Sequence, residues 1–282
     1  MTTFSEAFAS DKRTIAVDCD DVLCQTNATV AEMHNEIWGT DMTLEDFQHY
    51  LYWQNRGWGT PEETLRKVRH LYASGLLMRS QLIEGAAQGL SALKELGYRS
   101  DNQREETEAW LAKHLPDSMS KPHYLQTNLM PWARAVFEGV YYTGAFAAMH
   151  QTEQSGQTVA SMAPAKKKAS KADIGHQIGA FMLIDDSIEN ALDCATHHPN
   201  PLPVLLFGPY PWNRHVTKQD SPYDKAAHDE RIARGIDTDE GEALAGKLMW
   251  SGEDVGQALP ACVHRVRDWT EVVSFVKARG KV

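Results

Sequence analysis

Acidic side chains follow two short apolar runs of the sequence, and their positions point to chemistry. Asp18 and Asp20 come after one run, and Asp185 and Asp186 come directly after the other. Carboxylates two residues apart in a strand-to-loop turn can converge on one ligand, so Asp18 could attack a phosphorus atom while Asp20 protonates the leaving oxygen. Carboxylate oxygens are also the ligands that Mg²⁺ prefers. The two pairs together predict a magnesium-assisted site.

The position of these pairs at strand ends matters as much as their chemistry. Open α/β sheets bind ligands outside the carboxyl ends of their strands. Taken alone, an aspartate after a strand more often caps a helix or forms a turn. Two such pairs in one chain favour a shared catalytic site over two separate caps.

The two acidic stretches resemble motifs of a known superfamily. Residues 18–23 (DCDDVL) resemble the first motif of the HAD (haloacid dehalogenase-like) superfamily of phosphohydrolases, and residues 184–187 (IDDS) resemble its acidic fourth motif. Weaker similarity to its cytosolic 5′(3′)-deoxyribonucleotidase type C branch extends through residues 103–115 and 204–214. The resemblance implies an α/β fold, a HAD-like Rossmannoid three-layer sandwich with a parallel central sheet and a small helical cap.

The resemblance also assigns roles to individual residues. Asp18 would be the nucleophile that forms an aspartyl-phosphate, and Asp20 the acid/base. Mg²⁺ is the implied cofactor, with ligands from Asp18, Asp20, Asp185 and Asp186. A lysine from the third motif would hold the transferring phosphoryl group, and Lys171 is our candidate because it begins a predicted helix before the Asp185 strand. Lys168 is the alternative, although lysines in its Ser/Ala-rich loop are expected to be solvated.

The second motif of the superfamily, a phosphate-binding Ser or Thr at the end of an apolar strand, departs from the pattern. After Gly97 the chain passes into Ser100 and polar residues, without the four to six apolar residues that we expect of a buried strand. The sequence therefore predicts that the second core strand is missing. Ser100 is the candidate phosphate-binding hydroxyl, and a helix N-cap is its alternative role.

Hydrophobic periodicity and capping signals give the expected organisation of the chain. Apolar runs at 14–17, 140–144, 181–184 and 204–207 predict strands, and periodic segments at 86–96, 105–114, 171–178 and 269–277 predict helices. Residues 28–84 are mostly helical in pattern, with capping signals at Thr43 and Thr60. We expect a tail at 1–11, a core at 12–27 plus 85–282, a helical cap at 28–84, an aberrant insertion at 118–136 and a flexible loop at 150–170.

Composition restricts the class of protein and of partner. The 282 residues carry 28 Lys and Arg against 38 Asp and Glu, a formal net charge of −10, so the chain has no overall basic field for a nucleic-acid polymer. Four cysteines without a C-x-x-C pair indicate reduced thiols. The sequence shows neither a signal peptide nor a long apolar run, so we expect no membrane association and a cytoplasmic location.

The substrate expected is a small phosphorylated molecule, with a (deoxy)nucleoside monophosphate as the candidate that the resemblance suggests. The cap residues His34, Trp38, Tyr52, Trp53 and Trp58 could stack on a base, although packing within the cap is the more frequent role of such residues. Sugar phosphates and other small phosphomonoesters are alternative substrates.

Further side chains keep two interpretations each. Asn190 could support the acidic loop or cap a helix, and residues 209–214 could reach the site or form a rigid packed turn. His197 and His198 lack partners at metal-binding spacing.

Two other functions compete with phosphate hydrolysis. The defective second motif favours a catalytically impaired HAD-like protein, either a binding module or a defective gene model that retains residues 118–136. A dehalogenase would use Asp18 but would need neither Asp20 nor a metal, and the Asp-x-Asp pattern argues against it.

Overall fold

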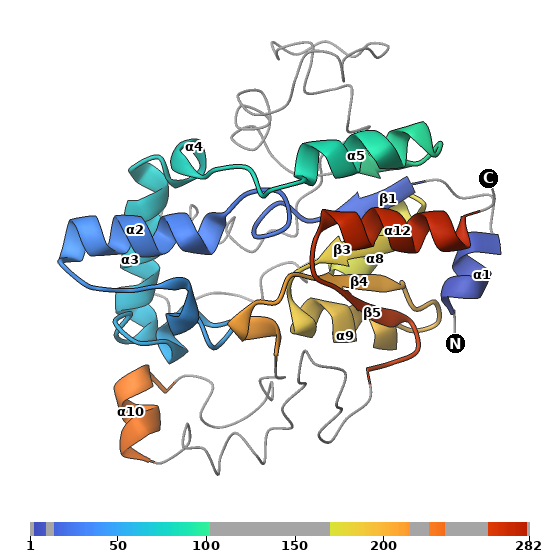
Figure 1. Cartoon of the computed structure of the whole chain (residues 1–282). Helices are drawn as coiled ribbons and strands as arrows, with labels where there is room; N and C mark the ends of the chain where they lie inside the picture. The colour runs from blue at the N-terminus through green and yellow to red at the C-terminus, as the bar shows by residue number, and fades with distance from the viewer. Residues whose placement is uncertain (1–2, 10–13, 102–169, 215–225, 235–258, 281–282) are drawn as a thin grey trace.

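The central element of the fold is a five-stranded parallel sheet. The computed structural model describes residues 3–9, 14–101, 170–214, 226–234 and 259–280 (Figure 1). Its strands lie in the order β2-β1-β3-β4-β5, and all pairs are parallel. Their bounds are β1 Thr14–Val17, β2 Arg99–Asp101, β3 Ala180–Asp185, β4 Val204–Phe207 and β5 Val263–Val266. The predicted α/β fold with a parallel central sheet is confirmed.

The inner strands are apolar throughout because both of their faces are covered. Alternate residues enter two hydrophobic clusters: Ile15 and Val17 join one, whereas Ala16 joins the other. All six residues of β3 are buried. Continuous apolar runs are typical of parallel strands with two covered faces, which is why the pattern predicted β1, β3 and β4 from sequence.

Helices cover both faces and make three layers. The first face carries α1 (Phe4–Ala9), α5 (Ala86–Glu95) and α12 (Trp269–Arg279), and the second carries α8 (Lys171–Gln177) and α9 (Ile188–Thr196). Helices α5 and α12 lie side by side (Figure 1). The predicted helices at 86–96, 171–178 and 269–277 are confirmed within two residues at each end.

The N-terminal segment differs from the expected tail. Residues Phe4–Ala9 form α1, and Phe8 packs edge-on against Phe181 with ring centroids 5.2 Å apart, while Phe4 packs against Phe275 at 4.9 Å. Both phenylalanines are buried. Two aromatic side chains one helical turn apart form a stripe that docks on the sheet layer, so this part of residues 1–11 belongs to the core.

The prediction of a missing second strand is wrong. Residues Arg99–Asp101 form β2, a short strand whose Ile15↔Ser100 and Ala16↔Asp101 pairs place it parallel to β1. Helix α5 ends before it with Gly97 in the left-handed region, at φ 81°, as the sequence indicated. A strand is defined by its backbone hydrogen bonds, so a polar stretch can pair with β1 without an apolar run.

The segment between β1 and α5 forms a helical cap, whose hydrophobic cluster also includes Trp212. It comprises α2 (Thr26–Trp38), η1 (Leu44–Asp46), η2 (Tyr52–Gln54), α3 (Pro61–Ala73) and α4 (Leu76–Arg79). The predicted capping boxes at Thr43 and Thr60 are both present. Two antiparallel segments connect the cap to the core, since Gln25 N donates to Gln81 O at 2.9 Å and Ile83 N to Leu23 O at 2.7 Å.

Several predicted features lie outside the described residues. These are the helix at 105–114, the strand at 140–144, the insertion at 118–136, Lys168 and all but the last residue of the loop at 150–170. Helix α10 (His228–Ala233) lies next to η2 of the cap. Among the helices described, none combines the length and apolar character needed to cross a membrane.

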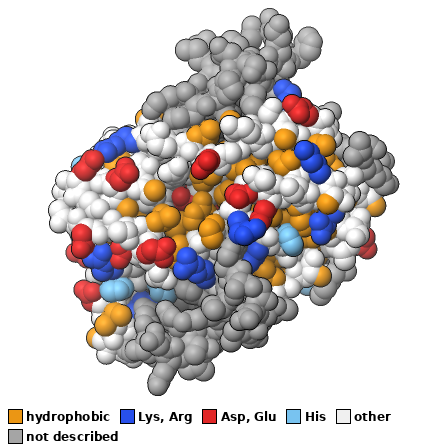
Figure 2. All heavy atoms as spheres, in the orientation of Figure 1, with side chains coloured by type: hydrophobic (Ala, Val, Ile, Leu, Met, Phe, Trp, Pro, Cys, Tyr) orange, Lys and Arg blue, Asp and Glu red, His pale blue; other side chains and the backbone are white. Residues whose placement is uncertain are grey.

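Charges of both signs are interspersed over the visible face of the molecule (Figure 2). The described part of this face shows no continuous basic surface.

The contact between Gly89 and Trp269 gives a first prediction. A Cβ at Gly89 would lie 2.8 Å from Cδ2 of Trp269, which is buried between α5 and the sheet. Gly89→Ala should lower the free energy of unfolding by about 1–3 kcal/mol, because overpacking outweighs the gain in helix propensity of ~1 kcal/mol. Urea unfolding measures this. The exposed neighbour Gln88→Ala is the control, and equal stabilisation of both variants would contradict the packing argument.

The buried His34 of the cap gives a second prediction, on pH. Burial, followed by the charge of Lys67, lowers the pKa of His34 to about 4. Between this value and the unfolded pKa of roughly 6.5, the unfolded chain binds a proton that the folded chain does not. Stability should therefore rise with pH across this window, by about 1–3 kcal/mol, and be lost as pH falls through 4.

The measurement is the free energy of unfolding in urea at several pH values from 4 to 7. His34→Gln should flatten the pH dependence, whereas the exposed cap variant His70→Gln should keep it. A slope that is identical in the wild type and His34→Gln would show that another group causes it.

Candidate active site

Lys171 joins the two acidic stretches that the sequence singled out. Its Nζ lies 2.6 Å from Oδ2 of Asp18 and 2.5 Å from Oδ2 of Asp185. Burial on its own would lower the pKa of Lys171, but the charges and hydrogen bonds of Asp18 and Asp185 hold it well above its ordinary value. The lysine therefore stays cationic between two carboxylates.

Neighbouring strands and one helix place these three residues. Strands β1 and β3 run side by side with Val17 opposite Ile184, and Asp18 N donates to Ile184 O at 2.9 Å. Asp18 and Asp185 are therefore carried to one edge of the sheet. Lys171 is the first residue of α8, whose start is fixed by a capping box between Ser170 and Asp173. The structure places Lys171, the predicted third-motif candidate, at this edge.

Asp185 is completely buried and is held by the loop that follows it. Its Oδ1 accepts hydrogen bonds from Ser187 N at 3.0 Å and from Asn190 Nδ2 at 3.1 Å. Burial raises the pKa of Asp185, and the charge of Lys171 opposes this rise. Of the two roles left open for Asn190, the structure shows support of the acidic loop, because Ser187 supplies the cap of α9.

Asp186 is held by a segment that follows β4. Trp212 Nε1 donates to its Oδ2 at 2.7 Å, and Asn213 Nδ2 donates to its backbone oxygen at 3.1 Å. Tyr210 stacks on Trp212 with ring centroids 4.4 Å apart. Residues 209–214 thus form a packed turn, η6 (Pro211–Asn213) at its centre, and also reach the site. The sequence did not assign Trp212 and Asn213, since no local pattern links them to Asp186.

The donor set at this edge suits a hard divalent cation. One carboxylate oxygen from each of Asp18, Asp185 and Asp186 lies within 4.8 Å of the others. Burial, and then the charges of Asp185 and its neighbours, raise the pKa of Asp186 well above its ordinary value. One lysine does not neutralise three clustered carboxylates, and oxygen ligands at this spacing fit Mg²⁺. The carboxylate of Asp20 is not a member of this group.

Asp20 belongs to the same loop and has different partners. Its Oδ1 accepts a hydrogen bond from Thr26 Oγ1 at 2.6 Å. Burial and the charge of Asp18 raise the pKa of Asp20, while Thr26 opposes the rise. A carboxyl with a raised pKa beside a carboxylate has the property needed to deliver a proton. Asp21 turns the chain here, at φ 53°.

The register of β2 gives no support to Ser100 as the phosphate-binding residue. Ser100 pairs with Ile15, three residues before Asp18. Three residues at about 3.3 Å each place the backbone of Ser100 ~10 Å before Asp18, measured along the strand direction. A hydroxyl level with Asp18 would come from residues after Asp101, outside the described part of the chain.

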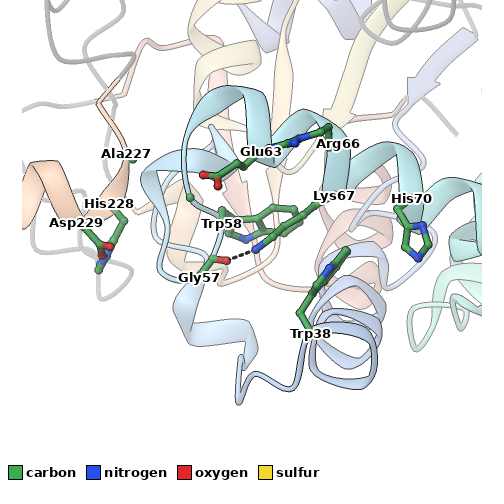
Figure 3. Close-up of a pocket in the computed structure, with 11 residues that line it drawn as sticks. Trp38, Gly57, Trp58, Glu63, Arg66, Lys67, His70, Ala227, His228 and Asp229 are labelled. Atoms are coloured by element: carbon green, nitrogen blue, oxygen red, sulfur yellow. Dashed lines mark hydrogen bonds and ion pairs between the residues drawn. The ribbon is translucent and has the colours of Figure 1, made fainter. Parts of the chain in front are cut away.

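The cap contributes a tyrosine, Tyr50, whose pKa responds to the charges of Lys171 and Asp185. The sequence did not predict this residue. Tyr50 is 43% exposed; its partial burial raises its pKa to about 12, while the charge of Lys171 lowers this pKa and that of Asp185 raises it. The predicted stacking residues have other contacts: Tyr52 stacks on Trp58 at 4.5 Å and donates to Asn27 Oδ1 at 2.6 Å. His34 and Trp58 are fully buried and pack within the cap, and Trp58 also lines a cavity there (Figure 3).

A cavity of about 670 Å³ lies in the cap and contains none of these catalytic candidates (Figure 3). Trp38, Arg66, Lys67 and His70 are among its lining residues, and α10 contributes His228 and Asp229. Lys67 donates to Gly57 O at 2.5 Å (Figure 3). This cavity is not the candidate active site, because the acidic residues of that site and Lys171 lie at the edge of the sheet and do not line the cavity.

Comparisons with known proteins give matches only among solved structures. No family model matches the sequence, and no curated protein matches it. A predicted phosphatase from Clostridium acetobutylicum is 12% identical, with a TM-score of 0.44, over 95% of this chain and 100% of that one. A HAD family hydrolase from Deinococcus radiodurans R1, with bound phosphate and sodium, is 13% identical with a TM-score of 0.44 over 95% and 96%.

A third similar structure is the L-2-haloacid dehalogenase from Xanthobacter autotrophicus, 11% identical with a TM-score of 0.42 over 94% of this chain and 98% of that one. Two of these three structures are thus named as a HAD family hydrolase and a haloacid dehalogenase. At TM-scores below 0.5 they do not decide its family, so a function has to rest on the chain's own residues.

The indole that holds Asp186 gives the third prediction. Trp212→Phe keeps the ring stacked on Tyr210 and removes the N–H donor to Asp186, so Mg²⁺ affinity should fall about 10- to 100-fold. Calorimetric titration with Mg²⁺ measures this. Trp58→Phe is a matched control, because the buried Nε1 of Trp58 has no hydrogen-bond partner among the described residues. Equal affinities of the two variants would refute the role of Trp212.

Proposed function

We propose that the chain is a HAD-type, magnesium-dependent phosphomonoester hydrolase that acts through an aspartyl-phosphate on Asp18. The observation that carries the proposal is the position of Lys171, 2.6 Å from Asp18 and 2.5 Å from Asp185. An aspartate that only forms a turn does not require a lysine that also contacts Asp185, at the end of a second strand. A nucleophile and a phosphate-binding cation need this proximity.

The residues divide the reaction into two steps. In the first, an oxygen of Asp18 attacks phosphorus, Lys171 binds the phosphoryl oxygens, and Asp20 gives its proton to the leaving alkoxide. In the second, Asp20 takes a proton from water, which attacks the aspartyl-phosphate and restores Asp18. The raised pKa of Asp20 suits the first step, and its hydrogen bond from Thr26 fixes the carboxyl in place.

Mg²⁺ would be held by Asp18, Asp185 and Asp186, with the backbone carbonyl of Asp20 as a further ligand. When bound, it supplies positive charge that offsets the carboxylates and the incoming phosphate. Asn190 and Trp212 orient Asp185 and Asp186 for this purpose. The protein supplies the orientation, since the loop after β3 fixes Asp185 and the turn after β4 fixes Asp186.

The proposed substrate is a small phosphorylated molecule, with a nucleoside monophosphate as the more specific candidate. The cap at 28–84 covers the core at 12–27 plus 85–282, and Tyr50 is the cap residue that we propose to meet the substrate. We propose a cytoplasmic role, with no nucleic-acid polymer as partner. These assignments rest on the resemblance of the motifs and on the mixed surface charge (Figure 2).

A catalytically impaired HAD-like protein is the second candidate function. The register of Ser100 favours it, because that residue stands at the level of Ile15 and leaves one arm of the phosphate site to residues beyond Asp101. A dehalogenase is disfavoured, since it would need neither a protonated Asp20 nor a metal.

The fourth prediction separates these functions. Purified chain with Mg²⁺ and an aryl phosphate should release phosphate, and Asp18→Asn should abolish turnover because the nucleophile is lost. Asp20→Asn should lower kcat by about 10²- to 10⁴-fold, the usual contribution of a general acid. The exposed Asp193→Asn on α9 should keep full activity. A wild type that is folded by circular dichroism but shows no turnover in the same assay would support the catalytically impaired protein instead.

A further inference from the structure

Two thiols lie beside the carboxylate of Asp20, and the proposed reaction does not use them. Sγ of Cys19 is 3.6 Å from Sγ of Cys24, and Sγ of Cys24 is 3.8 Å from Oδ1 of Asp20. One ligand atom from each of the three residues lies within 4.8 Å of the others. Both cysteines are buried, whereas Asp20 is partly exposed. Access to this group is therefore through Asp20.

Two of the three separations match the edges of a tetrahedral metal site, and the third, between Sγ of Cys19 and a carboxylate oxygen of Asp20, is within 4.8 Å. With Zn–S bonds of about 2.3 Å and Zn–O bonds of about 2.0 Å, two sulfurs on one ion lie about 3.8 Å apart, and a sulfur and an oxygen about 3.5 Å apart. The observed 3.6 Å and 3.8 Å are within 0.3 Å of these values. The ligand atoms would need little movement to bind an ion.

The backbone already holds this geometry. The loop closes on Cys19, whose carbonyl accepts from Leu23 N at 2.8 Å and from Cys24 N at 3.0 Å, and Asp21 N returns a bond to Cys24 O at 2.8 Å. Thr26 Oγ1 fixes Asp20 at 2.6 Å and also lies 3.1 Å from Sγ of Cys24. A preformed site spends little free energy on ordering its ligands.

We propose that Cys19, Cys24 and Asp20 form a second metal site, specific for a thiophilic divalent cation of the Zn²⁺ class, and that its occupation inhibits the enzyme. Binding releases three protons to solvent, one from each thiol and one from the Asp20 carboxyl, and forms two metal–sulfur bonds and one bond to the Asp20 carboxylate. A fourth position stays open for water. Thiolates select such ions over Mg²⁺, so the site is chemically separate from the all-oxygen group of Asp18, Asp185 and Asp186.

Inhibition follows from the use of one carboxylate for two purposes. A metal on Asp20 removes the proton that the leaving group needs, although Lys171 and Asp18 remain in place. This consequence rests on the proposed function, whereas binding of the ion does not. The two parts can therefore fail separately.

Binding is tested with Cd²⁺, whose bonds to thiolates give an ultraviolet charge-transfer band. In the presence of excess Mg²⁺, the full chain should bind one Cd²⁺ through two thiolates. All four cysteines are described, so the band has only two alternative sources, Cys194 and Cys262. The double variant Cys194→Ala/Cys262→Ala should keep the full band. Either Cys19→Ala or Cys24→Ala should lower Cd²⁺ affinity more than tenfold.

Inhibition is tested with Zn²⁺ in the aryl phosphate assay. Zn²⁺ should inhibit the wild type in the presence of excess Mg²⁺, and Cys19→Ala should resist at least tenfold more Zn²⁺. A full Cd²⁺ band in both Cys19→Ala and Cys24→Ala, or no band in the wild type, overturns the site. If the band behaves as expected but Zn²⁺ leaves turnover unchanged, the inhibitory role is overturned and the metal site stands. Without any turnover, the proposed function fails while the Cd²⁺ result still decides the site.

Discussion

The ammonium group of Lys171 is the constraint on which the arrangement of the site depends. It lies between carboxylates that come from two different strands, at 2.6 Å from Asp18 and 2.5 Å from Asp185. Buried carboxylates repel one another and lose hydration, so the fold can bring them together only if a positive charge accompanies them. Helix α8 supplies that charge from its first residue, and its capped start fixes where the lysine lies.

Support for this group comes from residues that are remote in sequence. Trp212 and Asn213 hold Asp186, and Arg265 of β5 donates to Asn213 at 3.1 Å, which connects the far edge of the sheet to the acidic loop. Trp269 Nε1 donates to Val22 O at 2.9 Å, so α12 holds the loop after β1 through a hydrogen bond to its backbone. The acidic residues are therefore positioned by the layers around them as much as by their own strands.

The loop after β1 carries both hard and soft ligands. Asp18 groups with the carboxylates of Asp185 and Asp186, and Asp20 groups with the thiols of Cys19 and Cys24. A tight loop of hydrogen-bonded turns gives each residue a fixed direction, so neighbours along the chain can serve different chemistry. The aromatic cluster of the cap reaches the site through Trp212, whose ring lies 6.4 Å from that of Phe47, whereas the cavity between the cap and α10 contains none of the acidic residues of the site.

The sequence by itself determined the features that depend on local physics. Apolar runs before Asp18 and Asp185 predicted two buried parallel strands, and Ser170 with Asp173 starts the helix that carries Lys171. Strand periodicity, capping and side-chain chemistry act within a few residues, so they can be recognised along the chain. The same logic failed for β2, because a polar strand is made by its pairing with β1 and not by its own composition.

Only the tertiary structure decided which side chains meet. The choice between the two roles of Asn190, the bond from Trp212 to Asp186 and the approach of Tyr50 to the charged group all join residues from separate elements. No periodicity encodes such contacts, since they arise from how the layers pack. The sequence determined that acidic residues stand at two strand ends, and packing of the strands and helices determined that they share one lysine.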